Sequence, residues 1–347
     1  MKRCIVKWLI FSIFSIFSFS AAFGLADASV AYAKWHGDLN VGAPECAHCL
    51  AMALLGPIID GHKVSFHPFS ALSPLVSSLI TGRIQIAQVD YPSLVSLASK
   101  DVPIVAISGE VNGGSDFVLN SRIKITPNDW NRLRQAIQKL VTGGKTFSIA
   151  SQYGTVQNVD IRLALVKHGI PLEDVKFINV PFQGMAGALQ SYEVDAAVPV
   201  QPVAAQITMS HIADHFSYLE NQPAGNLTNV VIVTRTFYKA HPALVDHIGS
   251  AMVHLVEYIK TPSGRRAWEL KIEKYTDFSS AVVKHAMATL VPDYKMPLGK
   301  IGVIGVNMFQ QGLISRKMDA SEMKHYVNYG PLMFATKSSA ATLGQQS

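Results

Sequence analysis

The chain has 347 residues, of which 49% are hydrophobic and 16% charged, and its net charge at pH 7 is +6. The 30 basic residues are dispersed along the chain rather than clustered, which argues against a nucleic-acid partner. The length suggests two domains with ample cores.

The first 33 residues have the pattern of an export signal. Basic residues at positions 2, 3 and 7 precede an apolar run over Trp8–Ala26, and Ala31-Tyr32-Ala33 matches the small-x-small site that a signal peptidase cleaves. Serines interrupt the apolar run, so we expect cleavage near Ala33 rather than a retained membrane anchor. The pattern therefore predicts an exported protein of the periplasm.

Strand and helix patterns alternate in the next part of the chain. Apolar β-rich runs predict strands, and segments with helical periodicity or capping signals separate them. In one helix, Ser73 is the expected N-cap and Pro74 the first helical residue. Alternating strands and helices predict a mostly parallel sheet with helices on both faces. The expected strands are 39–43, 63–69, 83–90 and 102–109, and the expected helices are 50–56, 73–82 and 93–100.

The alternation begins again after a strand-like segment at 116–120. A helix is expected over 126–144, with Thr126 as its N-cap. The strand 229–234 then opens a largely helical C-terminal part. Between these segments we expect strands at 145–151, 175–182 and 194–200, and helices at 155–169 and from 185.

Two α/β units joined at 116–120 and 229–234 predict two lobes with a hinge, because the chain leaves one lobe and later returns to it. The cleft between the lobes is the expected binding site. We expect lobe 1 to comprise 34–117 and 231–336, lobe 2 to comprise 118–230, and 337–347 to form a flexible polar tail.

Three segments of the chain resemble the periplasmic solute-binding proteins of ABC importers. They are 75–108, 147–182 and 187–202, and the segment 237–245 matches the helix that opens after the return crossing. The resemblance is to the sulfonate, nitrate and taurine branch, which also includes binders of thiamine-pyrimidine precursors. It covers nearly the whole chain after the signal, in the expected order.

The resemblance implies a two-lobed α/β fold of the type II-like periplasmic binding protein class. It implies a monomeric receptor, not an enzyme, that needs no cofactor and no metal. The receptor would capture a small anionic solute and deliver it to a membrane permease and its ATPase. Two features depart from the family: Gln201 stands before Pro202 where an acidic residue is usual, and the first loop carries Cys-x-x-Cys.

Candidate ligand-binding residues follow the strands of both predicted lobes. In open α/β sheets ligands bind at the carboxyl ends of strands, where helix N-termini offer free N–H groups that suit an anion. Glu110 also follows a strand, but we expect it to be solvated. The candidates are Glu45, Cys46, His48, Ser70, Asp90, Tyr91, Asn112, Gln152, Tyr153, Gly154, Thr155, Phe182, Gln183 and Gln201.

Cys46, His48 and Cys49 lie together and allow three interpretations. A local Cys46–Cys49 disulfide would stiffen the first binding loop, which is the interpretation we favour for an exported protein. A thiol redox centre or a metal site, with His62 or His67 as a further ligand, are the alternatives. A binder of a thiamine-pyrimidine precursor, or a related synthase, also stays open, although no acid–base or nucleophile–base spacing supports catalysis.

Overall fold

The structure is a computed structural model that describes residues 35–219 and 227–345. The predicted signal peptide and its cleavage site at Ala33 lie outside the described residues. Within these residues, no helix has both the length and the apolar character needed to span a bilayer.

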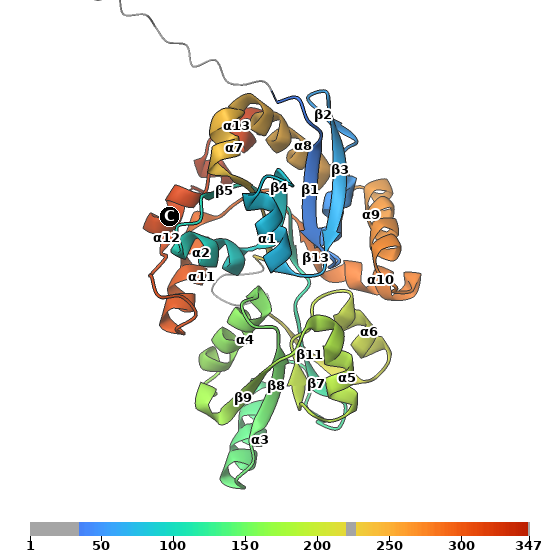
Figure 1. The fold of residues 1–347 in the computed structure, drawn as a ribbon. Helices are drawn as coiled ribbons and strands as arrows, with labels where there is room; N and C mark the ends of the chain where they lie inside the picture. The colour runs from blue at the N-terminus through green and yellow to red at the C-terminus, as the bar shows by residue number, and fades with distance from the viewer. Residues whose placement is uncertain (1–34, 220–226, 346–347) are drawn as a thin grey trace, which may run out of the picture. The chain divides into compact units, whose positions relative to one another are not determined.

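The first sheet has six strands in the order β2-β3-β1-β4-β12-β5 (Figure 1). β1 runs parallel to β3 and β4, whereas β12 runs antiparallel to both β4 and β5. The sheet is therefore mixed, because the strand that returns at 229–234 runs against its neighbours. The strands are β1 (Leu39–Pro44), β2 (Ile58–Ile59), β3 (His62–Phe69), β4 (Ile86–Asp90), β5 (Ile104–Gly109) and β12 (Asn229–Thr234).

The second sheet has five strands in the order β11-β7-β10-β8-β9. β8 is parallel to β9 and β10, while β7 is antiparallel to β10 and β11. β11 was not predicted: its sequence ADHFSY alternates poorly and carries several polar residues. The strands are β7 (Asp116–Asn120), β8 (Phe147–Ser151), β9 (Val175–Asn179), β10 (Ala196–Ala197) and β11 (Ala213–Tyr218).

Each sheet is buried on both faces, which explains the nearly continuous apolar strands. On β12, Val230 and Ile232 enter one core cluster, whereas Val231 and Val233 enter the cluster on the opposite face. On β7, Phe117 and Val118 likewise divide between two clusters. Side chains alternate between the faces of a strand, so a strand that is apolar at every position needs cover on both sides.

The helices flank these sheets, and a short two-stranded sheet pairs β6 (Val111–Gly113) with β13 (Leu290–Pro292). The helices are α1 (Leu72–Ile80), α2 (Tyr91–Ser99), α3 (Trp130–Thr142), α4 (Val156–Lys167), α5 (Met185–Gln190), α6 (Val203–Met209), α7 (Arg235–Ala240), α8 (Pro242–Lys260), α9 (Pro262–Tyr275), α10 (Ser280–Ala286), α11 (Leu298–Gln310), α12 (Ala320–Met323) and α13 (Gly330–Thr336).

Helix starts differ from the sequence prediction in detail. α1 begins after Ala71, so Ser73 lies inside the first turn instead of capping it. α3 begins after Asp129, whose side chain accepts a hydrogen bond from the Arg132 N–H at 2.9 Å, and Thr126 is not the cap. The predicted helix 50–56 is a short 3-10 helix over Cys49–Leu54.

The C-terminal segment differs from the flexible tail that the sequence predicts. Leu343 is buried in the same core cluster as α2 and α11, and its carbonyl accepts a hydrogen bond from the Met296 N–H at 3.0 Å. One leucine among small polar residues is a weak signal in sequence. Here it fills a gap beside the loop that precedes α11.

Candidate functional site

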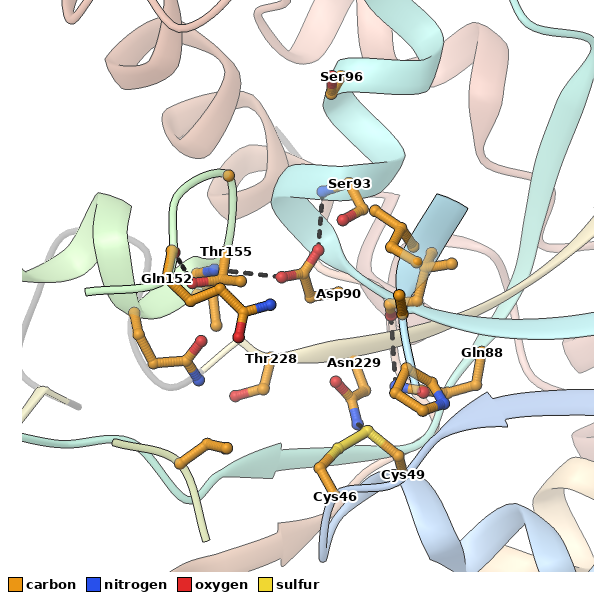
Figure 2. Close-up of a pocket in the computed structure, with 18 of the residues that line it drawn as sticks. Cys46, Cys49, Gln88, Asp90, Ser93, Ser96, Gln152, Thr155, Thr228 and Asn229 are labelled. Carbon is orange, nitrogen blue, oxygen red and sulfur yellow. Dashed lines mark hydrogen bonds between the residues drawn. A yellow bond between two sulfur atoms is a disulfide. The ribbon is translucent and has the colours of Figure 1, made fainter. Parts of the chain in front are cut away.

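A cavity of about 750 Å³ takes its lining from segments that follow strands of both sheets. Figure 2 shows Cys46, Cys49, Asp90 and Asn229 on one side, with Gln152 and Thr155 coming from the loop after β8. Most of the residues predicted from the sequence line this cavity. They are Glu45, Cys46, His48, Ser70, Asp90, Gln152, Tyr153, Gly154, Thr155, Phe182 and Gln183.

Three candidates lie elsewhere. Tyr91, the first residue of α2, is fully buried and packs in the core instead of lining the cavity. Asn112 is also buried, and its Oδ1 accepts a hydrogen bond from the Thr228 N–H at 2.9 Å. Gln201 lines a neighbouring cavity of about 340 Å³, where its Oε1 accepts from the Ala205 N–H at the start of α6.

Sequence reasoning missed several polar residues of the cavity wall. Gln88 lies inside β4, and Thr228 and Asn229 lie at the start of β12. The polar side chains within an apolar strand could have identified these residues in the sequence, because a buried amide needs either a partner or a ligand. Ser93, Ser96 and Lys100 on or just after α2 complete the polar wall on that side.

Asp90 connects the N-termini of two helices. Its Oδ1 accepts a hydrogen bond from the Ser93 N–H at 2.8 Å and thereby caps α2, while its Oδ2 accepts from the Val156 N–H at 3.2 Å (Figure 2). Val156 is the first residue of α4, which packs on the second sheet. Burial raises the pKa of Asp90 above its ordinary value, and these hydrogen bonds oppose that shift in part.

A second carboxyl, Asp160 on α4, lies close enough to Asp90 to feel its charge. Burial, together with the nearby Asp90 charge, raises the pKa of Asp160 well above its ordinary value. Two buried carboxyls near each other do not both ionise readily, and Asp90 is the one that accepts two backbone N–H groups, which favour its charged form.

His48 lies in the cavity wall as a neutral ring. Burial lowers its pKa to about 3, because the charged ring would be removed from water. Its Nδ1 has no hydrogen-bond partner among the described residues. Gly114, with φ +79°, passes so close that a Cβ there would lie 3.2 Å from this nitrogen.

Cys46 and Cys49 are joined by a disulfide, with their Cα atoms 5.1 Å apart. The loop is fixed from several directions: Trp268 Nε1 donates to the Ala47 carbonyl at 2.8 Å, and the Ala47 N–H donates to the Gln201 carbonyl at 3.1 Å. The Asn229 amide lies against Cys49, with Nδ2 3.7 Å from Sγ. The disulfide therefore forms a rigid part of the cavity wall.

The donor atoms of Cys46, His48 and Cys49 lie within 4.8 Å of one another, as a metal site would require. In this state, however, the two sulfurs are bonded to each other and are not thiolates, the form that binds metal. The proposed additional ligands are engaged elsewhere: His62 Nδ1 lies 3.0 Å from the Gly37 carbonyl, and His67 Nε2 lies 2.9 Å from Asn40 Oδ1.

Glu110 was expected to be solvated, and the structure shows the opposite. Its side chain is fully buried near Asn229 and the Met52 backbone, and burial raises the pKa of this carboxyl well above its ordinary value. The position of Glu110 at the end of a strand does not predict its burial, because β6 begins immediately at Val111 and pairs with β13.

The loop after β8 is built by local hydrogen bonds. Gln152 Oε1 accepts from the Phe182 N–H at 3.3 Å, which ties this loop to the one after β9. Thr155 is the N-cap of α4 as predicted, but its hydroxyl donates to the Gln152 carbonyl at 2.7 Å and makes no capping bond. Tyr153 is 49% exposed, and its hydroxyl donates to the Phe177 carbonyl. Gly154 has φ +81°, which favours glycine at this turn.

Solved structures share this fold over most of the chain at low sequence identity. The nitrate-binding protein NrtA from Synechocystis PCC 6803 matches with a TM-score of 0.74 and 11% identity, covering 88% of this chain and 90% of its own. The alkanesulfonate-binding protein SsuA from Xanthomonas axonopodis pv. citri, bound to MOPS, matches with a TM-score of 0.67 and 15% identity, covering 86% of this chain and 100% of its own.

A zinc-bound ligand-binding component of an ABC-type import system from Staphylococcus aureus matches with a TM-score of 0.70 and 10% identity. It covers 88% of this chain and 100% of its own. These matches confirm the predicted α/β fold of periplasmic binding proteins, here with two mixed sheets flanked by helices.

Family membership comes from the sequence comparison. A search of curated proteins found no match. The model of the NMT1-like family matches residues 42–270, which is more than half of the chain. That segment contains β7, the first strand of the second sheet, β12, with which the chain returns to the first sheet, and nearly all of the cavity wall. The chain therefore belongs to the NMT1-like family.

Proposed function

We propose that the chain is the extracytoplasmic solute-binding component of an ABC importer. One observation carries the proposal: a cavity of about 750 Å³ is lined from the carboxyl-end loops of strands in both sheets. That is where α/β folds bind small molecules, and the volume is in the range of small-ligand sites. The shared fold supports the same function. Its partners would be a membrane permease and an ATPase, with the periplasm as its compartment.

The predicted lobes, 34–117 with 231–336 and 118–230, would close on the solute as a hinged pair. Two hydrogen bonds already connect them across the cavity region: Val156 to Asp90, and Gln157 Nε2 to Ser115 Oγ at 2.9 Å. A solute that contacts both sides would favour the closed population by its differential affinity. No turnover is needed for this role, so we propose a receptor and not an enzyme.

The charge of the solute distinguishes between the candidate ligand classes. The sequence resemblance implies a sulfonate, nitrate or taurine type of anion. Among the described residues that line the cavity, the charged side chains are Glu45, Asp90 and Lys100. Asp90 stands where the helix N-termini would otherwise receive an anion, and this observation favours the other ligand class of the resemblance, an amino-substituted heteroaromatic ring.

A ligand screen tests the receptor function. Wild-type protein is heated with members of each class: an alkanesulfonate, taurine, nitrate, an aromatic carboxylate and the aminopyrimidine precursor of thiamine. At a concentration 100 times its Kd, a true ligand adds about 2.7 kcal/mol to the free energy of unfolding and raises the Tm. Any compound that binds should be recovered unchanged, and chemical conversion of it would contradict the receptor assignment.

Phe182 offers a matched pair of variants for the same screen. Phe182 lines the cavity, so Phe182→Ala should weaken solute binding at least tenfold, since it removes about 1.5 kcal/mol or more of apolar contact. Phe309 on α11 lies outside the cavity wall and is 42% exposed, so Phe309→Ala should leave the Kd unchanged. Equal Kd values for the two variants would show that the solute binds elsewhere.

A further inference from the structure

We propose that the solute presents a hydrogen-bond-donating nitrogen, as an ammonium, an amidinium or a ring amine, to Asp90. This inference rests on the proposed receptor function and makes its substrate class specific. It departs from the anion that the sequence resemblance implies.

The Asp90 carboxylate already occupies the position at the helix N-termini where an anionic ligand would bind. Its two carboxylate oxygens accept the N–H groups of Ser93 and Val156, at 2.8 and 3.2 Å, at the starts of α2 and α4. An incoming sulfonate or nitrate would lose these donors and would meet a negative charge within a few ångströms. Each carboxylate oxygen retains a second lone pair, which can accept an N–H group from the cavity.

One further acceptor and one ring nitrogen of the cavity wall lack partners. Gln88 is fully buried, and its Oε1 has no hydrogen-bond partner among the described residues, while its Nε2 donates to the Val89 carbonyl at 3.4 Å. The Nδ1 of His48, which is 3% exposed, is equally unpaired within the described ranges. An unmet buried polar atom costs about 1–3 kcal/mol, so a solute with N–H groups would recover that energy.

The one basic side chain among the described lining residues does not offset Asp90. Lys100 follows the C-terminal end of α2, whereas Asp90 is the N-cap of the same nine-residue helix. The ten-residue separation places the two backbones about 15 Å apart along the helix axis. Glu45, the other carboxylate of the cavity wall, is exposed, whereas Asp90 is more deeply buried and is held by two backbone N–H groups.

The test uses three probes on a benzene scaffold, benzylamine, benzamidine and benzenesulfonate, together with 4-aminopyrimidine as a ring amine and nitrate as the inorganic anion. Isothermal titration of wild-type protein should show binding of at least one nitrogen donor and none of the anions. Asp90→Asn should weaken that binding at least 100-fold, because the amide keeps the size but loses the charge. Gln88→Leu removes a hydrogen-bond acceptor without changing the net charge, and it should weaken binding of the nitrogen donor about tenfold.

Asp129→Asn is the matched control. Asp129 caps α3 by the same hydrogen bond that Asp90 makes to α2, but it is exposed and does not line the cavity. Its replacement should leave the Kd of the bound probe unchanged. Thermal melts of all variants show that each is folded under the conditions of the titration.

The outcomes separate this inference from the receptor function. Binding of benzenesulfonate or nitrate without any amine would overturn the inference and leave the receptor function standing. The inference would also be overturned if an amine binds but Asp90→Asn and Gln88→Leu weaken its binding no more than Asp129→Asn does. If neither these probes nor the solutes of the wider screen bind, the receptor function fails and the inference fails with it.

Discussion

Buried ionisable side chains lie in and near the cavity wall, and burial shifts the pKa of each in the direction that favours its neutral form. The pKa of His48 is lowered to about 3, whereas the pKa values of Glu110 and Asp160 are raised well above their ordinary values, in each case chiefly by burial. Burial penalises the charged form of every such group, so the direction depends only on whether the group is an acid or a base. The N–H groups of Ser93 and Val156 oppose this shift at Asp90.

The His48 ring predicts a specific dependence of stability on pH. In the unfolded chain its pKa is 6.5, and in the folded chain about 3, so below pH 6.5 only the unfolded state takes up the proton. Wild-type protein should lose about 1.4 kcal/mol per pH unit from this group as the pH falls from 6.5 towards 3. His48→Gln lacks that contribution, and urea unfolding at pH 7, 6, 5 and 4 measures the difference.

The carboxyl groups titrate in the same pH range. They contribute equally to the free energy of unfolding of wild-type protein and of His48→Gln, so their contribution cancels when the two values are subtracted. A wild-type minus His48→Gln difference that is flat between pH 7 and 4 would contradict the burial of a neutral His48.

At the level of elements, close packing of α11 depends on glycine. A Cβ at Gly305 would lie 1.8 Å from the Met318 carbonyl oxygen, and one at Gly302 would lie 2.4 Å from the Ala320 backbone nitrogen. The segment that leads into α12 therefore lies directly on the α11 backbone. Since α11 contributes Met308 to the cavity wall, this packing also helps to position that wall.

Gly305→Ala should destabilise the protein by about 1–3 kcal/mol, because the added methyl group forces backbone atoms apart. Gly187→Ala is the control: Gly187 is exposed on α5 with no atom within 4 Å of a built Cβ, so alanine there should stabilise by about 0.5–1 kcal/mol. Urea unfolding curves measure both changes. Similar effects from the two substitutions would show that α11 and the Met318 segment are not in contact.

For the whole molecule, the proposed function requires a change in the distance between lobes. Small-angle X-ray scattering should show a smaller radius of gyration when wild-type protein is saturated with a probe that binds it. Asp90→Asn at the same probe concentration should show no decrease, because it lacks the charge that we assign to recognition. An unchanged radius of gyration in saturated wild-type protein would argue for a rigid site and against hinge closure.

Much of the fold follows from local patterns. The apolar strands β4, β5 and β8 and the helices α3 and α4 lie where periodicity and turn residues predict them, because these signals act over a few neighbouring residues. β11 and the buried Leu343 were missed, since their stability comes from partners distant in sequence. The lobe boundaries themselves stay a proposal.

The residues of the candidate site were likewise predicted only in part. Strand ends such as Asp90, Gln152 and Phe182 were predicted, because the carboxyl edge of a sheet gathers its loops whatever their sequence. The neighbours Asp90 and Tyr91 show the limit: one lines the cavity and the next is buried in the core. Which way each side chain points depends on how α2 packs, and no local pattern contains that information.

The sequence by itself determined the α/β class, the family and the set of loops that meet at the cavity, since those follow from local periodicity and order along the chain. Only the tertiary structure placed the Asp90 carboxylate on the N–H of Val156, 66 residues away, and left the buried Oε1 of Gln88 in the same cavity wall without a partner among the described residues. Charge and hydrogen-bond complementarity depend on distances between segments far apart in sequence. The predicted character of the solute changed for that reason.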